Sequence, residues 1–262
     1  MCSCQDFARS TLYAVFLLAA LSQPASSQVA VGYTGSLPTE KNSDLNQEMQ
    51  LGTPLQREGL LKALGVDLVF VNEIATAVPH TELRIDPVDG TDANLLFLPC
   101  GGPGSPQAYF YLLRPGQDQH WHAIDSVHLD CWSEPTSYEW IQVQGKPGRS
   151  ILAHHVNHGH GSGMVEDHMQ LFEVRGDHLV SVLDTEEYTS QAKAGTNDTT
   201  QHSSTLLSFP DGSIEETRIT TNRNGSTDQP MPASIVSVER RRWHCVERSK
   251  SYVPGKFVVI HP

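Results

Sequence analysis

The sequence predicts an antiparallel all-β fold, arranged as a sandwich, a barrel or a small propeller, with one short N-terminal helix near residues 53–64. Short apolar runs recur along the chain and suggest a meander of about a dozen strands. Turn-forming glycines separate successive runs at positions 116, 145 to 148, 176 and 212, a spacing of roughly thirty residues that is typical of hairpins. Only one stretch carries the start and stop signals of a helix.

The first 27 residues have the pattern of a secretory signal peptide. Arg9 supplies a positive charge before the apolar run of residues 11–21, and Ala25 and Ser27 occupy the −3 and −1 positions of a signal-peptidase site. A membrane-spanning helix needs about 20 apolar residues, and this run is shorter. We therefore expect cleavage near Ser27, a secreted or periplasmic (extracytoplasmic) location, and no membrane span in the mature chain.

Residues 28–51 are polar and show no sustained periodicity, so we expect a flexible mature N-terminus before a single β-rich domain at residues 52–262. The helix signal opens this domain. Thr53 is suited to the N-cap, Pro54 to the first helical position, and Gln56 to the partner position of a capping box.

The same stretch predicts which helical residues face the core and where the helix ends. Leu55, Leu60 and Leu61 can share an apolar stripe, with Leu64 one turn further on. Gly65 then suits the position just after the C-terminus, where a left-handed backbone is common.

Most of the expected strands come in pairs around a turn. Four segments consist of an apolar run, a turn rich in glycine or proline, and a second apolar or alternating run: residues 108–124, 139–156, 169–183 and 204–219. Two shorter apolar runs suggest buried strands, at residues 67–71 and 94–98. A closing pair is expected from residues 234–245 and 255–260.

Removal of the signal peptide would leave three cysteines, Cys100, Cys131 and Cys245. In an oxidising compartment this number allows one bridge and one leftover thiol. Cys100 and Cys131 each end a stretch in which apolar residues alternate onto one strand face, so both thiols are expected to point into the same core. They are also closer in sequence to each other than to the third cysteine, and we predict a Cys100–Cys131 disulfide.

The chain is acidic, with a formal net charge of −12. Such a surface repels phosphate backbones and anionic lipid, so we expect no nucleic-acid partner. The basic cluster at residues 239–250 alternates with acidic residues, which an edge or outward strand face explains. Asn197 and Asn224 open N-glycosylation sequons in polar loops, and their use depends on the host.

The most unusual stretch is HHVNHGHGSG, residues 154–163, with four histidines in its first seven positions. Its glycines argue against the helix that an H-E-x-x-H zinc site needs. In extended chain, however, His158 and His160 share one face about 6–7 Å apart, as do His120 and His122, and this spacing suits two imidazole ligands on one ion. Further ligands could come from Asp167 and His168. The other interpretation is a polar, glycine-rich turn between two strands.

Two functional hypotheses follow. The preferred one is a secreted, non-catalytic, β-rich binding or envelope-associated protein that needs no cofactor and whose ligand and partners are unknown. The alternative is a metal-dependent, zinc-type hydrolase that uses the histidines near residues 120–122 and 158–168. In such a site the ion would lower the pKa of bound water and supply hydroxide at neutral pH.

Overall fold

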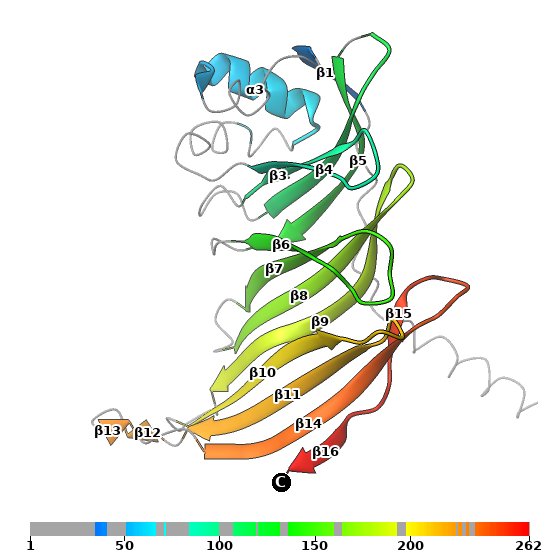
Figure 1. Ribbon diagram of the computed structural model, residues 1–262. Helices are drawn as coiled ribbons and strands as arrows, with labels where there is room; N and C mark the ends of the chain where they lie inside the picture. Colours follow the sequence, from blue (N-terminus) through cyan, green and yellow to red (C-terminus); the bar gives the residue numbers. More distant parts are fainter. Residues whose placement is uncertain are drawn as a thin grey trace, which may run out of the picture. The chain divides into compact units, whose positions relative to one another are not determined.

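A computed structural model describes the chain over the following residues: 35–40, 51–66, 71, 84–99, 107–118, 120–131, 136–159, 164–192, 198–223, 225–226, 229–230 and 234–261. Over these ranges the protein is mostly antiparallel β-structure with one short helix, as the sequence predicts (Figure 1). Of the architectures considered, the arrangement is sandwich-like, because one apolar cluster joins strands of two large sheets.

The smaller of these sheets has five antiparallel strands in the order β1-β5-β4-β3-β2. Their bounds are Gly35–Glu40 for β1, Arg84–Pro87 for β2, Asn94–Leu98 for β3, Gln107–Pro115 for β4 and His120–Asp130 for β5. Strands β3, β4 and β5 fall on predicted apolar runs. Strand β1 lies in the segment that was expected to be flexible, and it pairs with β5. Its pairing uses backbone groups, which a polar sequence does not reveal.

The larger sheet has nine strands, in the order β15-β14-β11-β10-β9-β8-β7-β6, with β16 also paired to β14. Their bounds are Ser137–Ile141 (β6), Ser150–Gly159 (β7), Met164–Arg175 (β8), His178–Ala192 (β9), Thr199–Ser208 (β10), Ile214–Arg223 (β11), Ser234–Cys245 (β14), Tyr252–Pro254 (β15) and Val258–His261 (β16). The pairing of β14 with β16 confirms the predicted closing pair. A two-stranded hairpin, β12 (Gly225–Ser226) with β13 (Gln229–Pro230), follows β11.

The helix, α3, spans Pro54–Ala63 and has the predicted capping box at Thr53 and Gln56. Gly65 follows with a φ of 73°, the left-handed backbone expected at this position. The predicted apolar stripe is correct for the three later leucines, which are buried, but wrong for Leu55, which is 77% exposed. Leu55 lies in the first turn of the helix and is left in solvent.

The five-stranded sheet is buried on both faces, and strand β4 shows why its sequence is almost continuously apolar. Tyr109, Tyr111 and Leu113 belong to a cluster with residues of the helix α3. The alternate residues, Phe110 among them, belong to a second cluster that includes residues of β6 to β9. Successive strand residues point to opposite faces, so a strand covered on both sides needs apolar residues at every position.

A third apolar cluster lies within the nine-stranded sheet and the segments that cover it. Its buried members are Val143, Leu152, Met169, Leu171, Val182, Leu183, Ile214, Trp243 and Tyr252. The predicted strand at residues 67–71 falls outside the described residues except for Val71, which is buried in the cluster with α3. Across the described ranges, no helix has the length and apolar character needed to cross a membrane.

Candidate functional site

The two histidines predicted on β5, His120 and His122, both contact Asp118 in the turn that precedes this strand. The backbone N–H of His120 donates to Oδ1 of Asp118 at 3.1 Å, and Nε2 of His122 lies 2.8 Å from the same oxygen. The hydrogen bond from His122 is the main reason that the pKa of Asp118 lies below its usual value. The imidazole also lies close to Gly116, where an added Cβ would come within 2.3 Å of Nε2. This contact explains a glycine at the turn.

Of the other predicted residues, His158, Asp167 and His168 belong to the nine-stranded sheet. His158 is opposite Val165 in the pairing of β7 with β8, and its side chain lies outside the described residues, as does the whole of His160. Asp167 and His168 are on β8. The ring of His168 stacks on that of His155 at 5.3 Å, and its Nδ1 lies 3.4 Å from Oδ1 of Asp184.

No set of three or more His, Cys, Asp or Glu side chains within the described ranges is arranged to hold a metal ion. His120 and His122 belong to one sheet, whereas Asp167 and His168 belong to the other. The side chains of His158 and His160 are not among the described ones. The zinc hypothesis therefore stays a prediction.

Carboxylates far away in sequence accompany two histidines of this sheet. Nδ1 of His154 lies 2.7 Å from Oε2 of Glu187, 33 positions later. This contact, opposed by partial burial, raises the pKa of His154 above its ordinary value of 6.5. The pKa of His168 is raised in the same way, chiefly by its hydrogen bond to Asp184. Sequence spacing gave no indication of either carboxylate.

Of the three cysteines expected in the mature chain, Cys131 is fully buried in the cluster between the two sheets. Cys100 lies outside the described residues, so the proposed disulfide stays a prediction. Cys245, at the end of β14, is a half-buried free thiol.

A carboxylate that the sequence did not single out is the most deeply buried charge described. Glu216 on β11 has no exposed surface. Its Oε2 accepts hydrogen bonds from Nε of Arg241 at 2.6 Å and from the indole of Trp243 at 2.9 Å. The hydroxyl groups of Thr185 and Ser204 each donate to it at 3.2 Å. These donors satisfy a charge that would otherwise be strongly destabilising in the interior.

The same cluster corrects the interpretation of residues 239–250 as an outward or edge face. Arg241 turns inward to Glu216 and its side chain is only 17% exposed. Its neighbour Arg240 does face outward, and is 3.5 Å from Glu215 at the surface. One side of the basic segment is therefore part of a buried network.

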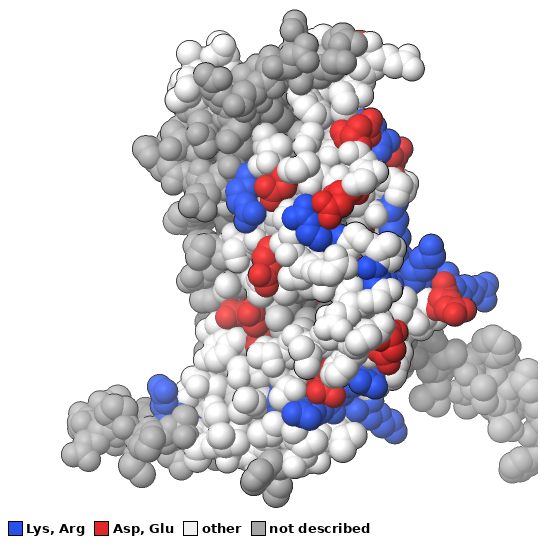
Figure 2. Space-filling model, in the orientation of Figure 1, with Lys and Arg blue, Asp and Glu red and all other residues white. Residues whose placement is uncertain are grey.

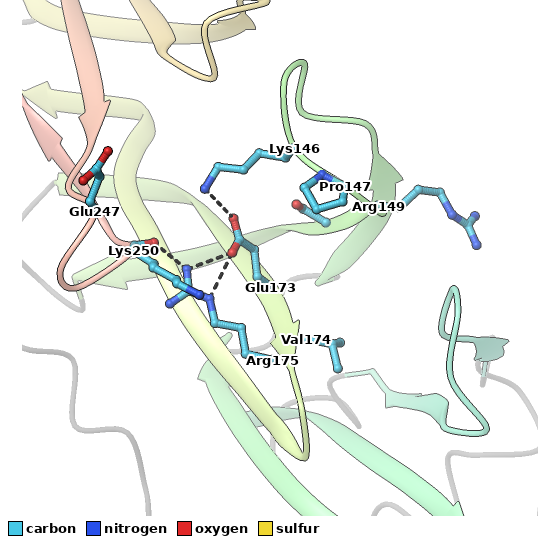
Figure 3. A pocket seen from close by; sticks show the side chains of 9 residues that line it. Lys146, Pro147, Arg149, Glu173, Val174, Arg175, Glu247 and Lys250 are labelled. Atoms are coloured by element: carbon cyan, nitrogen blue, oxygen red, sulfur yellow. Dashed lines mark hydrogen bonds and ion pairs between the residues drawn. The ribbon is translucent and has the colours of Figure 1, made fainter.

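The described chain also contains a cavity of about 510 Å³ (Figure 3). Two hairpin turns border it, the turn between β6 and β7 and the turn between β14 and β15. The first residue of β7 and three residues of β8 supply the rest of the lining. The lining residues are Lys146, Pro147, Arg149, Ser150, Glu173, Val174, Arg175, Glu247 and Lys250. The sequence identified the first turn and the basic segment, but not that they meet, because about a hundred residues separate them.

Ion pairs link three of the side chains that line the cavity, Arg175, Glu173 and Lys146. Nε and Nη2 of Arg175 donate to Oε2 of Glu173 at 3.0 and 2.8 Å, and Nζ of Lys146 lies 3.6 Å from Oε1 of the same carboxylate. Arg175 also donates to the backbone carbonyls of Ser249 and Lys250, so it fastens the β14–β15 turn to β8 (Figure 3). The side chains of the cavity are thereby positioned before any ligand arrives.

The two remaining cations of the lining, Arg149 and Lys250, differ in how they are neutralised. Arg149 forms a two-point ion pair with Asp89 at 2.7 Å, outside the lining. Within the described ranges, no carboxylate pairs with the ammonium group of Lys250. The described lining has four cationic and two carboxylate side chains, and so an excess of positive charge.

Lys146 makes a further contact beside the cavity. Its Nζ donates to Sγ of Cys245 at 3.2 Å and lies 5.4 Å from the centre of the Tyr252 ring. The hydroxyl group of Tyr252 donates in turn to the carbonyl of Gly212. Burial is the main cause that raises the pKa of Tyr252 to about 12. The phenol is therefore a neutral hydrogen-bond donor at physiological pH.

Comparisons of the chain with protein-family models, with curated proteins and with solved structures find no match.

Proposed function

We propose that this protein is an exported, non-catalytic binding protein whose ligand is a small anion held in the cavity between the β6–β7 and β14–β15 turns. The observation that carries the proposal is the excess of cationic over acidic side chains in this lining, in a chain whose formal net charge is −12. A cationic cavity in an acidic protein concentrates anions at one place, because the rest of the surface repels them.

The charges elsewhere are distributed differently. On the face shown in Figure 2, basic and acidic side chains are interspersed. Such pairs neutralise one another locally, and their fields are screened within about 8–10 Å at physiological ionic strength. In the cavity, by contrast, no described carboxylate pairs with the ammonium group of Lys250, and a carboxylate, sulfate or phosphate group is the natural counter-ion for it.

Binding rather than catalysis is proposed because of the residues that line the cavity. The described lining residues include no histidine, and Glu173 is engaged with Arg175 and Lys146. Its carboxylate therefore neutralises cations and is poorly suited to accept a proton from a substrate. A volume of about 510 Å³ fits a small molecule, within the range of about 300–1,000 Å³ usual for ligand pockets.

Calorimetric titration of the whole mature chain with inorganic phosphate, sulfate and citrate tests the proposal. We expect at least one anion to bind, and its affinity to fall as sodium chloride is added at constant pH. Lys250→Gln should weaken that binding about three- to tenfold, since one charged hydrogen bond contributes about 1 kcal/mol or somewhat more.

Lys256→Gln is the matched control, because it removes the same charge from an exposed position that does not line the cavity. Its affinity should equal that of the unchanged protein. An absence of binding for all three anions, or an equal loss in both variants, contradicts the proposal.

Export is a separate part of the proposal and rests on the signal pattern of the first 27 residues. We expect the exported chain to begin near Gln28. N-terminal sequencing and the intact mass of secreted material measure this directly, and a retained Met1 on exported protein contradicts it. For the zinc-type hydrolase, no observation in the described residues speaks in favour.

A further inference from the structure

The contact between Lys146 and Cys245 brings together two reactive groups from distant parts of the chain. Nζ and Sγ are 3.2 Å apart, although the residues are separated by 99 positions. Lys146 lies in the β6–β7 turn and Cys245 at the end of β14. The sulfur belongs to a free thiol. An amine and a thiol in van der Waals contact can react with each other once either is activated.

The surroundings hold the lysine amine against the sulfur. The carboxylate of Glu173 lies 3.6 Å from Nζ on one side, and the ring of Tyr252 lies 5.4 Å away on another. Both Lys146 and Cys245 are half-buried rather than exposed, which limits the directions in which their side chains can turn. The approach is therefore a property of the packed structure, not of two freely moving surface groups.

Small solutes can reach both members of this pair. Lys146 is one of the residues that line the cavity of about 510 Å³, and Figure 3 shows its amine directed toward Glu173 inside the cavity. Cys245 does not line the cavity, but its side chain is half-buried rather than fully enclosed, so a small neutral oxidant can reach the sulfur.

We propose that Lys146 and Cys245 form an oxidative modification site, at which a peroxide converts the thiol and the amine into a covalent sulfur–nitrogen cross-link. A sulfenic acid is the first product of thiol oxidation, and it condenses with a nitrogen nucleophile nearby to give a sulfenamide. With the Lys146 amine already in contact, this condensation has a strong advantage of proximity over reaction with groups in solution.

The step is balanced with hydrogen peroxide as the oxidant. The sulfur of Cys245 attacks one peroxide oxygen, the O–O bond breaks, and the thiol proton leaves with the other oxygen as water. Sulfur has then lost two electrons and carries a hydroxyl group. The Lys146 nitrogen, after losing its ammonium proton to solvent, attacks this sulfur. The S–O bond breaks, hydroxide departs, and it takes a nitrogen proton to form a second water.

The product ties the β6–β7 turn to the end of β14 and removes the positive charge of Lys146 from the cavity wall. The chain as a whole loses two hydrogen atoms. An added thiol reverses the reaction, because it attacks the cross-linked sulfur and releases the amine.

Mass spectrometry of the full mature chain after treatment with hydrogen peroxide tests the proposal. We expect a mass lower by two hydrogen atoms, located by peptide mapping to a single linked peptide that contains residues 146 and 245. Treatment with dithiothreitol should restore the original mass and both separate peptides.

Two variants keep the test independent of folding defects. Lys146→Arg keeps the positive charge but replaces the nucleophilic amine, and its Cys245 should oxidise without losing two hydrogen atoms. Cys245→Ser should show no change at Lys146. Treated wild-type protein in which Cys245 carries two or more oxygens, or is bridged to another cysteine, while Lys146 stays unmodified overturns the proposal.

Discussion

The two large sheets differ in the kinds of residue that they bury. The five-stranded sheet is covered on both faces, by α3 on one and by strands of the other sheet on the second, and its central strand β4 is apolar at nearly every position. The nine-stranded sheet mixes apolar positions with buried polar ones. The contrast shows that burial in one sheet depends on the hydrophobic effect alone, whereas in the other it also depends on hydrogen bonds that must all be made.

The difference extends to chemistry. The cavity, the Lys146–Cys245 contact and the pairs His154–Glu187 and His168–Asp184 all lie in or beside the nine-stranded sheet. The outermost strand of the same sheet, β16, also leaves apolar side chains in solvent, with Val258 63% exposed. A sheet whose side chains are not all buried in an apolar core can also carry polar sites.

The largest effect is expected from a substitution at the junction where the two sheets pack against each other. Phe110 is 1% exposed and its ring lies 4.9 to 6.0 Å from those of Phe97, Tyr138 and Phe172, the last two in the other sheet. Phe110→Ala should lower the free energy of unfolding by about 3–5 kcal/mol, as usual for a large aromatic side chain in a core. Urea denaturation followed by fluorescence measures the loss.

Leu207→Ala is the comparison for this variant. Leu207 is an apolar residue of the nine-stranded sheet that is 58% exposed, so its loss should change the free energy of unfolding by less than about 0.5 kcal/mol. Equal losses in the two variants would mean that Phe110 is not a junction residue.

The second effect concerns the buried charge of the nine-stranded sheet. Glu216→Gln leaves Arg241 without its anionic partner in the interior, and removal of one member of a buried pair costs about 3–5 kcal/mol. The amide oxygen still accepts a hydrogen bond, so we expect the lower end of this range. The neighbour Glu215 provides the control, because its pair with Arg240 is at the surface and Glu215→Gln should cost about 0–1 kcal/mol. Thermal and urea unfolding of both variants decide the matter.

A third effect is the pH dependence of the nine-stranded sheet. The pKa values of His154 and His168 are raised in the folded protein, first of all by hydrogen bonds to Glu187 and Asp184. Folding therefore favours the protonated imidazoles. Their contribution to stability is fully present below the unfolded-state pKa of about 6.5, and it is lost as the pH rises through the raised folded values.

Urea unfolding at a series of pH values around neutrality measures this loss. Glu187→Gln should remove the part of this loss that comes from His154. The free energy of unfolding of the variant should therefore depend less on pH above pH 6.5. Tyr188→Phe, one residue along β9, keeps the charges unchanged and should retain the full dependence. A pH profile of Glu187→Gln that coincides with that of the unchanged protein speaks against the assignment.

The sequence was informative where a signal is local. Hairpins require a turn between two runs, so the glycines at positions 145, 148, 176 and 212, whose φ lies near +60° to +76°, located three strand pairs correctly. Strand β1 was missed because a polar strand at a sheet edge differs little from a loop in composition. Leu55 was misplaced because helical periodicity alone does not tell which turn of a helix extends beyond the sheet it covers.

The candidate site could not be predicted from the sequence, for a different reason. Lys146 and Lys250 each look like ordinary turn lysines, and nothing in their neighbourhoods tells that the two turns border one cavity. The burial of Glu216 is equally non-local, since its donors come from β9, β10 and β14. The dense histidines attracted attention by composition, whereas the cavity depends on which strands are neighbours.

The smallest expected effect tests the one local signal that the structure reproduces in full. The backbone N–H of Gln56 donates to Oγ1 of Thr53 at 3.3 Å, and Oε1 of Gln56 accepts from the Thr53 backbone at 2.8 Å. Thr53→Ala removes the first bond and should cost about 1 kcal/mol, whereas Thr53→Ser keeps it and should cost little. Because α3 covers one face of the five-stranded sheet through Leu60 and Leu61, fraying at its start should increase amide exchange in its first turn before that of β4. Hydrogen exchange measured on both variants shows whether the first turn of α3 loses protection before β4 does. A uniform loss of protection would mean that the cap stabilises the sheet as a whole and not the helix end alone.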